Sequence, residues 1–392
     1  MMNPSKNIIE AKVEAKDTEK DRDRSDQCPG IHKLHHAADG AIGRLRFPGG
    51  RLSPADLEKL ATIAKEHGDG HVHATMRGNV QIRGIKDPEA FPHAVEQAGI
   101  HAHPSHELVR NIIASPYTDP ELIRALDEAI CAAEQIASLT ARTLFGIDSG
   151  QGDILAEKPD FCLSPHGLYI AGTWMSKADS QAGLNAAGIE ELIAAATHWA
   201  QNRGNYWRVA EHPDFLSSWQ HSNGINPDDA PNDETNLDTR HEQPLIGWFD
   251  RDGHVDLGAG LPFGILPAEI LSVIGKDITL TPWRSIIIHN LDEAEAEAVV
   301  RYTASRGLVY DARSPWLSIT ACTGSPGCPK SLSDVRADAR SLIEQRSMSE
   351  EPIDPADRRV HFVGCGRRCG RPNGHYLEYQ ATGEGEYETI YR

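Results

Sequence analysis

Four of the seven cysteines in this chain fall in two short glycine-rich blocks near the C-terminus, and they constrain its fold more than any other feature. Five residues separate Cys322 from Cys328, and three separate Cys365 from Cys369. An apolar segment that predicts a strand, 316–320 or 360–363, comes before each block. Thiolates from two such loops can converge on one metal centre, and a thiolate-only ligand set suits zinc or an iron–sulfur cluster.

The spacing of these cysteines favours a cluster over a single ion. A structural zinc site usually has two to four residues between the cysteines of each pair, and one pair here exceeds that. The surrounding glycines leave room for a bulky cubane, whose sulfurs can accept hydrogen bonds from backbone N–H groups. We therefore expect a [4Fe–4S] cluster, with zinc or unliganded thiols as the alternatives. Cys131 and Cys162, in apolar segments, are expected to be small buried side chains.

Charge and hydropathy exclude two classes of partner. The 392 residues carry a formal net charge of −18, whereas nucleic-acid binding needs a basic face. No apolar run is long enough to cross a membrane. The first 27 residues are rich in charge and lack the apolar region of a secretory signal, so they predict a disordered tail and a cytoplasmic protein.

A faint internal repeat predicts two related β-α-β halves. Pro48–Gly50 is similar to Pro262–Gly264, and Thr75–Arg77 is similar to Thr281–Arg284, which matches Arg284 with Arg77. In the first half, Ser53 followed by a proline predicts a helix start. Ala-rich periodicity predicts helices over 119–138 and 188–203, and an acidic stretch with proline and asparagine predicts a loop over 227–243.

The two cysteine blocks, following a duplicated half, resemble the sirohaem-dependent nitrite/sulfite reductase superfamily. The resemblance implies an α+β fold with pseudo-duplicated ferredoxin-like half-domains and two α/β domains that bind a tetrapyrrole and the cluster. It also implies that Cys322, Cys328, Cys365 and Cys369 hold a [4Fe–4S] cluster. The expected divisions are a tail (1–27), a first half-domain (28–110), a first α/β domain (111–225), an acidic linker (226–245), a second half-domain (246–312) and a cluster-binding domain (313–392).

Smaller blocks are similar to the precorrin-3B synthase family within that superfamily. They are Cys28–Gly30, the stretch from Asp39 to Gly50, Gly146–Asp153 and Arg336–Ala339. This resemblance implies an O₂-dependent monooxygenase of aerobic cobalamin biosynthesis. It would hydroxylate precorrin-3A at C20 and close a γ-lactone with the ring A acetate. The chain has no nicotinamide-binding G-x-G-x-x-G motif after a strand, so electrons would come from NADH acting directly or from a separate reductase.

Arginines carry the expected contacts with the carboxylates of a tetrapyrrole, because a guanidinium pairs a carboxylate through two hydrogen bonds. The family's T-x-R-x-x-x-Q motif spans 75–81, its R-N motif is Arg110-Asn111, and its R-K-x-K segment begins at Arg142. Thr143 and Phe145 replace both lysines. The tetrapyrrole-binding residues we expect are Arg46, Arg77, Gln81, Arg110, Asn111 and Arg142. Further candidates are Arg44, Arg51 and Arg83, with Arg284 a weaker one.

The missing lysines argue against reduction of a small anion, which needs cationic groups to bind the anion and supply protons. A sirohaem-dependent sulfite or nitrite reductase nevertheless remains an alternative, so bound sirohaem is undecided. A zinc-stabilised binding protein is the third hypothesis. Histidines near the start and near residue 103 could hold a mononuclear non-haem iron, a site that the family resemblance also implies. The histidines considered are His32, His35, His36, His101, His103 and His106.

Overall fold

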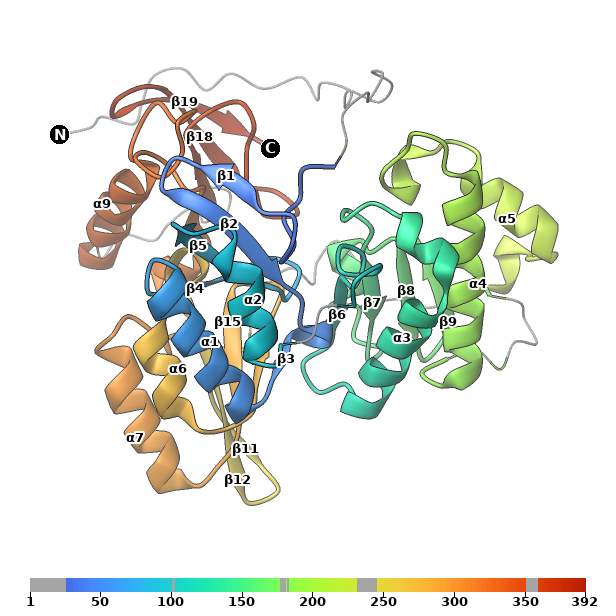
Figure 1. Cartoon of the computed structure of the whole chain (residues 1–392), viewed down its shortest axis with the longest axis horizontal. Coiled ribbons are helices and arrows are strands. Elements are labelled where there is room, and N and C mark those ends of the chain that lie inside the picture. Colours follow the sequence, from blue (N-terminus) through green and yellow to red (C-terminus); the bar gives the residue numbers. More distant parts are fainter. Residues whose placement is uncertain (1–25, 101–102, 177–180, 182, 231–244, 350–358) are drawn as a thin grey trace.

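Two five-stranded sheets of the same construction organise the computed structural model of this chain (Figure 1). The structure describes residues 26–100, 103–176, 181, 183–230, 245–349 and 359–392. Most of the expected tail and of the expected acidic linker therefore lies outside the described residues. Within them, no helix is long and apolar enough to span a membrane.

Each of the two sheets takes one strand from the other half of the repeat. The first has the order β1-β2-β5-β4-β13 and the second β11-β12-β15-β14-β3. Strand β13 of the second half joins the first sheet, and strand β3 of the first half joins the second sheet. The two halves therefore share one pseudo-twofold core, and neither half forms a complete sheet by itself. The strands of the first sheet are β1 (His35–Ala37), β2 (Gly40–Leu45), β5 (Val80–Ile85), β4 (His71–Ala74) and β13 (Ile265–Pro267). Those of the second are β11 (Gly247–Arg251), β12 (His254–Gly260), β15 (Ser285–Leu291), β14 (Ile278–Leu280) and β3 (Arg51–Leu52).

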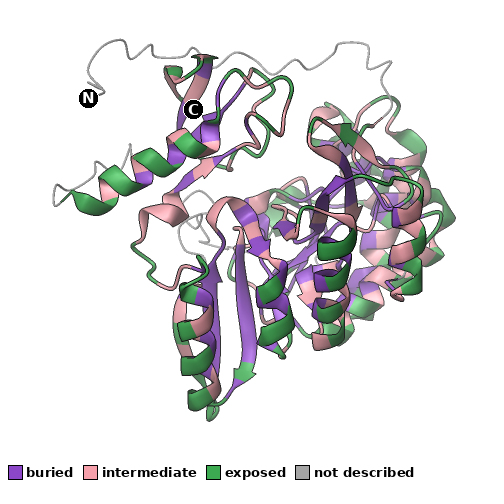
Figure 2. Cartoon of the chain, turned by 60° about the vertical axis from the view of Figure 1, so that its left-hand side comes forward, coloured by how far each residue is buried: buried purple, intermediate pink, exposed green. Residues whose placement is uncertain are grey.

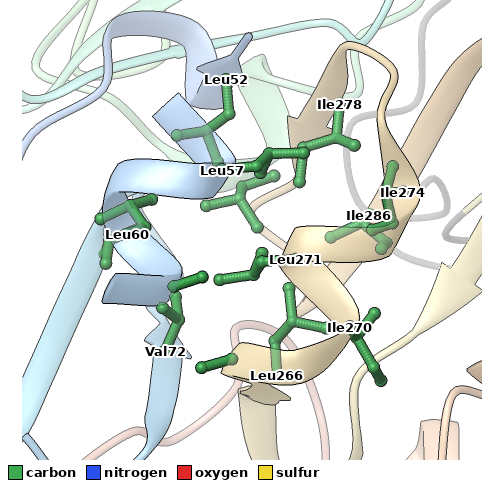
Figure 3. Packing of buried hydrophobic residues seen from close by; sticks show 14 of the residues in the cluster. Leu52, Leu57, Leu60, Val72, Leu266, Ile270, Leu271, Ile274, Ile278 and Ile286 are labelled. Carbon is green, nitrogen blue, oxygen red and sulfur yellow. The ribbon is translucent and has the colours of Figure 1, made fainter. Parts of the chain in front are cut away.

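Helices α1 (Pro54–His67) and α6 (Ala268–Ile274) are the equivalent first helices of the two halves and pack on one another. As predicted, Ser53 caps α1: its hydroxyl accepts from the backbone N–H of Asp56, whose carboxylate accepts from the N–H of Ser53. Leu57 and Leu60 meet the side chains of α6 in the shared core (Figure 3). The helices α2 (Ala90–Gln97) and α7 (Glu293–Ala304) complete the halves.

The middle of the chain forms a separate lobe, green in Figure 1. Its sheet has the order β10-β9-β8-β7-β6, and β6, β7 and β8 run parallel. The expected helix over 119–138 ends earlier, at Ala132, and continues as a 3₁₀ turn over Glu134–Ser138. The elements are β6 (Ile112–Ala114), β7 (Phe145–Ile147), β8 (Phe161–Ser164), β9 (Gly167–Ile170), β10 (Thr173–Trp174), α3 (Pro120–Ala132), α4 (Ala186–Asn202) and α5 (Phe215–Asn223).

The C-terminal lobe carries both cysteine blocks on one four-stranded sheet with the order β16-β17-β18-β19. The strand expected over 316–320 is wrong in part, because α8 (Pro315–Ser318) comes first and the strand begins at Ile319. Proline at the first helical position favours that turn. The elements are α8, β16 (Ile319–Ala321), α9 (Val335–Met348), β17 (Val360–Val363), β18 (Leu377–Gly383) and β19 (Glu386–Tyr391).

The fold class predicted from the sequence is confirmed, including its duplicated halves. Burial follows the same plan: the strands are mostly buried and the outward faces of the helices are exposed (Figure 2). Cys162 is buried as expected, but the prediction for Cys131 is wrong, because its side chain on α3 is only partly buried.

The structure corrects one detail of the repeat. Thr75 and Thr281 make the same hydrogen bonds in the two turns, and each hydroxyl accepts from the backbone N–H two residues later, that of Arg77 or Trp283. Gly78, with φ +62°, is therefore equivalent to Arg284, with φ +55°. Trp283, and not Arg284 as the sequence suggested, takes the position of Arg77.

Candidate tetrapyrrole and cluster site

A row of polar side chains crosses the first sheet. In the strand pairing, Arg44 on β2 lies opposite Gln81 on β5, and Gln81 lies opposite His73 on β4. Side chains directly opposite one another share a face of the sheet, so these three residues lie on one face. The other face carries Leu45, Val80 and the rest of the apolar core. Alternation along each strand thus separates a polar face from the core.

Arg44 and Arg46 bring positive charge to this region without full compensation. Burial lowers the pKa of Arg44, and burial together with the nearby charge of Arg44 lowers that of Arg46 to about 9. Nε of Arg44 and Nη1 of Arg46 are buried without a hydrogen-bond partner. A buried donor left unpaired is costly, so these two atoms indicate a missing anionic or acceptor group.

Arg77 extends the same cationic region from the turn between β4 and β5. Its guanidinium donates to the carbonyl oxygens of Ala141 at 2.6 Å and Arg142 at 3.0 Å, which ties the turn to the central lobe. Burial and the charges of Arg208 and Arg44 lower the pKa of Arg77 to about 10. The side chain still keeps accessible surface.

Arg142 completes what we call the arginine group: Arg44, Arg46, Arg77 and Arg142. Its side chain is exposed, it lies 5.2 Å from the ring centre of Trp207, and its charge lowers the pKa of Arg44. The next position, Thr143, is fully buried, and so is Phe145. The two positions where the family resemblance expects lysines therefore point into the core of the central lobe.

The second half of the repeat has no counterpart of the first two arginines. By strand register, Gly258 and Gly260 on β12 occupy the places of Arg44 and Arg46. A Cβ atom at Gly258 would lie 1.9 Å from the carbonyl oxygen of Leu245, and one at Gly260 would lie 2.2 Å from the side chain of Leu317. The chain itself fills this space, so at these two positions the described second half offers no cationic face.

Asn111 supports the arginine group from the central lobe. Its side-chain oxygen accepts from Nε of Arg46 at 3.3 Å and from Asn79 at 3.0 Å, and its amide nitrogen donates to backbone carbonyl groups, including that of Ala141. All of these partners are protein groups, so no hydrogen-bonding atom of this amide is shown to await a ligand. The amide therefore orients Arg46 and joins the first half of the repeat to the central lobe.

Three other arginines named from the sequence have protein partners outside the arginine group. Arg110 pairs with both oxygens of Asp127 on α3, at 2.8 and 2.6 Å. Arg51 donates to Thr279 in the second half, at 3.2 Å. Arg83 pairs with Asp39 at 2.9 Å, near the first cysteine block. The sequence motif alone could not distinguish these internal pairs from ligand contacts.

The four C-terminal cysteines gather at one end of the C-terminal lobe. Burial, together with the charges that thiolates at Cys322, Cys365 and Cys328 would carry, raises the pKa of Cys369. The backbone N–H of Gly364 donates to Sγ of Cys322 at 3.3 Å, the kind of bond that stabilises a cluster sulfur. A Cβ atom at Gly364 would lie 1.8 Å from the Ser331 hydroxyl, so the two loops meet only because this residue is glycine.

This thiol set fits an iron–sulfur cluster better than a single ion. Among the residues with described positions, no three His, Cys, Asp or Glu side chains are close enough to hold one metal ion. The four thiols are near enough for their charges to act on one another, and four thiolates are the usual ligands of a [4Fe–4S] cluster. Bound iron would neutralise the mutual repulsion of their thiolates.

The loop after Cys365 is held by buried polar contacts. Nε2 of His361 donates to the carbonyl oxygen of Cys369 at 3.1 Å, and Nδ1 lies 2.8 Å from the hydroxyl of Thr320. Burial and the nearby charge of Arg284 lower the pKa of His361 to about 3, so the imidazole is neutral at physiological pH. Arg284 itself donates to the carbonyl oxygen of Gly370 at 2.6 Å.

Several residues at this site carry no recognisable signal in the sequence. The thiol of Cys28 lies beside the Arg44 guanidinium, although the sequence indicated only a family motif. Glu157 accepts from Trp283 at 3.0 Å and from Asn373 at 2.6 Å, joining three lobes. No local pattern predicts these contacts, because their partners are distant in the sequence.

Of the histidines considered for a mononuclear iron, His103 and His106 lie side by side, with their Nδ1 atoms 3.3 Å apart, but no third His, Cys, Asp or Glu of the described residues completes a metal site with them. His106 is buried and bonds to the carbonyl oxygen of Ala133, whereas His32 and His36 are exposed. His101 lies outside the described residues.

Comparison with known proteins agrees with this architecture. Residues 35–91 match the nitrite/sulfite reductase ferredoxin-like half domain. A ferredoxin–nitrite reductase of Leptolyngbya laminosa is 35% identical over 90% of this chain and 79% of its own length. The chain therefore belongs to the nitrite/sulfite reductase family of redox enzymes.

Two further relatives extend the comparison. A precorrin-3B synthase of Sinorhizobium sp is 24% identical over 89% of this chain and 79% of its own length. The solved structure of the Mycobacterium tuberculosis NirA protein superimposes with a TM-score of 0.66 at 19% identity, over 89% of this chain and 73% of that one, and shows the same fold.

Proposed function

We propose that this chain is a precorrin-3B synthase that uses a [4Fe–4S] cluster. The observation that carries the proposal is a contrast within one site. The first half keeps a cationic face with two unpaired buried donors, whereas the positions expected to hold lysines in an anion reductase are Thr143 and Phe145, both buried. The site thus favours an organic polycarboxylate over sulfite or nitrite.

The arginine group binds and orients the substrate in this proposal. Guanidinium groups form paired hydrogen bonds with carboxylates and keep their charge at any physiological pH. Three of the tetrapyrrole contacts predicted from the sequence lie in this group: Arg46, Arg77 and Arg142. The fourth member, Arg44, was a further candidate. Gln81 shares the face of Arg44 and would contribute a neutral donor. Arg110 and Asn111 would act by positioning, because protein groups already satisfy them.

Cys322, Cys328, Cys365 and Cys369 would hold the cluster, which supplies electrons one at a time when it is bound. The overall reaction consumes precorrin-3A, O₂, two electrons and two protons. One oxygen atom enters at C20, the other leaves as water, and the ring A acetate closes the γ-lactone. The electrons come from NADH or from a separate reductase. The reaction belongs to aerobic cobalamin biosynthesis in the cytoplasm.

The test is an assay of the reconstituted protein with precorrin-3A, a reductant and ¹⁸O₂, followed by mass spectrometry. We expect a product one oxygen atom heavier than the substrate, with that atom derived from ¹⁸O₂. Without O₂ the substrate should be recovered unchanged. Absence of a labelled product, from protein with a full complement of iron and sulfide, would contradict the proposal.

A sirohaem-dependent nitrite or sulfite reductase is the second candidate. The 35% identity with a nitrite reductase favours it. Turnover of nitrite or sulfite with reduced methyl viologen, together with the red absorption band of bound sirohaem, would select it over the synthase. An absorption spectrum with cluster absorption alone would select the synthase.

A further inference from the structure

Arg284 has a backbone conformation that is unfavourable for its residue type. Its φ is +55°, in the left-handed region, and the equivalent residue in the first half is glycine. Any side chain pays a steric penalty in this region that glycine avoids. Such strain persists only where the surrounding structure imposes it, and it is concentrated at functional sites.

The side chain of Arg284 is directed at the loop that carries Cys369. One guanidinium nitrogen donates to the carbonyl oxygen of Gly370 at 2.6 Å. A Cβ atom at Gly370 would lie 3.0 Å from that nitrogen, and one at Gly264 would lie 3.5 Å from the Arg284 side chain. The arginine therefore packs closely against both glycines.

The charge of Arg284 is not neutralised by a neighbouring acid. Within the described part of the chain, Arg284 forms no ion pair with a carboxylate. The charged group that acts on the Arg284 guanidinium is another cation, Arg336, which lowers its pKa. Arg336 in turn interacts with Cys322. Arg336 on helix α9 thus acts on the thiol of Cys322, and Arg284, just before β15, reaches the residue that follows Cys369.

We propose that Arg284 raises the reduction potential of the cluster by placing a fixed positive charge beside Cys369. Reduction adds one negative charge to a cluster, and a nearby cation stabilises that added charge. This inference rests on the proposed cluster. It explains why the second half has a strained arginine where the first half has glycine.

The test compares full-length Arg284→Gly, Arg284→Gln and Arg284→Lys with the wild-type protein. Glycine relieves the backbone strain, glutamine keeps an amide donor without charge, and lysine keeps the charge. Arg301→Gln on the exposed face of α7 is the matched control. Iron and sulfide content is measured first, and the reduced fraction is then followed by electron paramagnetic resonance during a redox titration with dithionite.

At a fixed potential, we expect the ratio of reduced to oxidised cluster to fall about tenfold in the glycine and glutamine variants, equivalent to about 59 mV for one electron. Lysine and the control should stay close to wild type. A wild-type potential in a fully loaded uncharged variant would overturn the inference and leave the proposed function intact. Loss of the cluster from both uncharged variants would overturn it in favour of a structural role. A wild-type protein without iron and sulfide would instead overturn the proposed function.

Discussion

Arg77 and Trp283 occupy the same position in the two turns of the repeat, and both donate hydrogen bonds to the central lobe. Arg77 donates to the carbonyl oxygens of Ala141 and Arg142, and the indole of Trp283 donates to Glu157 at 3.0 Å. The first turn brings a cation to an incompletely paired group of arginines. The second turn instead brings the neutral indole of Trp283 to the carboxylate of Glu157, which also accepts a hydrogen bond from Asn373. At this position the two halves of the duplicated fold therefore differ, and the first presents a cation where the second presents a neutral ring.

Substitution of Cys369 by serine is expected to abolish cluster assembly, because a serine hydroxyl replaces the thiolate that iron prefers. Iron and acid-labile sulfide per chain should fall at least about fivefold after anaerobic reconstitution. Cys131→Ser on α3 is the matched control and should bind as much iron as wild type. Equal iron in the Cys369 and control variants would contradict the assignment of Cys369 as a ligand.

Substitution of Arg77 by glutamine should weaken tetrapyrrole binding about 10- to 100-fold, since a charged hydrogen bond contributes about 1.5–3 kcal/mol. Arg77→Lys should fall in between, because lysine lacks the paired donors. Binding of precorrin-3A, followed by protein fluorescence, measures both. Arg124→Gln, on the exposed face of α3, is the control. If all three variants bind like wild type, Arg77 serves only to join the two lobes.

Substitution of Arg46 by methionine should stabilise the ligand-free protein and weaken ligand binding. The pKa of about 9 means that the folded state disfavours the charged guanidinium, and this cost is present in full at neutral pH. Removing the charge and the unpaired Nη1 should raise the free energy of unfolding by about 1–2 kcal/mol. Urea denaturation and precorrin-3A binding are the measurements. A less stable variant with unchanged affinity would show that Arg46 is purely structural.

The stability of the protein should depend on Asp153 at mildly acidic pH. Burial and the charge of Asp148 raise the pKa of Asp153 from 3.8 to about 6. Between these values the folded state holds more protons than the unfolded state, so this carboxyl group lowers stability as the pH rises through that window. Asp153→Asn should remove this decline and stabilise the protein at pH 7 by roughly 1–3 kcal/mol.

Thermal denaturation from pH 4 to pH 8 measures this effect. Asp252→Asn, in the exposed turn between β11 and β12, is the control and should follow the wild-type profile. An Asp153→Asn profile parallel to wild type would show that this carboxyl group does not titrate in the window.

Local features of the sequence predicted much of this protein. The spacing of the four cysteines, the Ser53 cap and the amphipathic periods depend on neighbours a few residues apart. These features can therefore be predicted from the sequence without knowledge of the fold. The fold class followed from the resemblance that these motifs bear to a known family, and the structure gathers the four cysteines at one end of a lobe.

Tertiary packing decided which arginines remain open to a ligand. Arg110 belongs to the same family motif as Asn111, but Asp127, on a helix formed later in the chain, satisfies it. Arg46 forms no such ion pair in the described part of the chain, although the charge of Glu107 acts on it, and a glycine takes its place in the second half, where Leu317 occupies the space. The sequence by itself determined the residue types, the local turns and the cysteine spacing. Only the tertiary structure decided which charges are neutralised, because burial and ion pairing depend on groups brought together from distant parts of the chain.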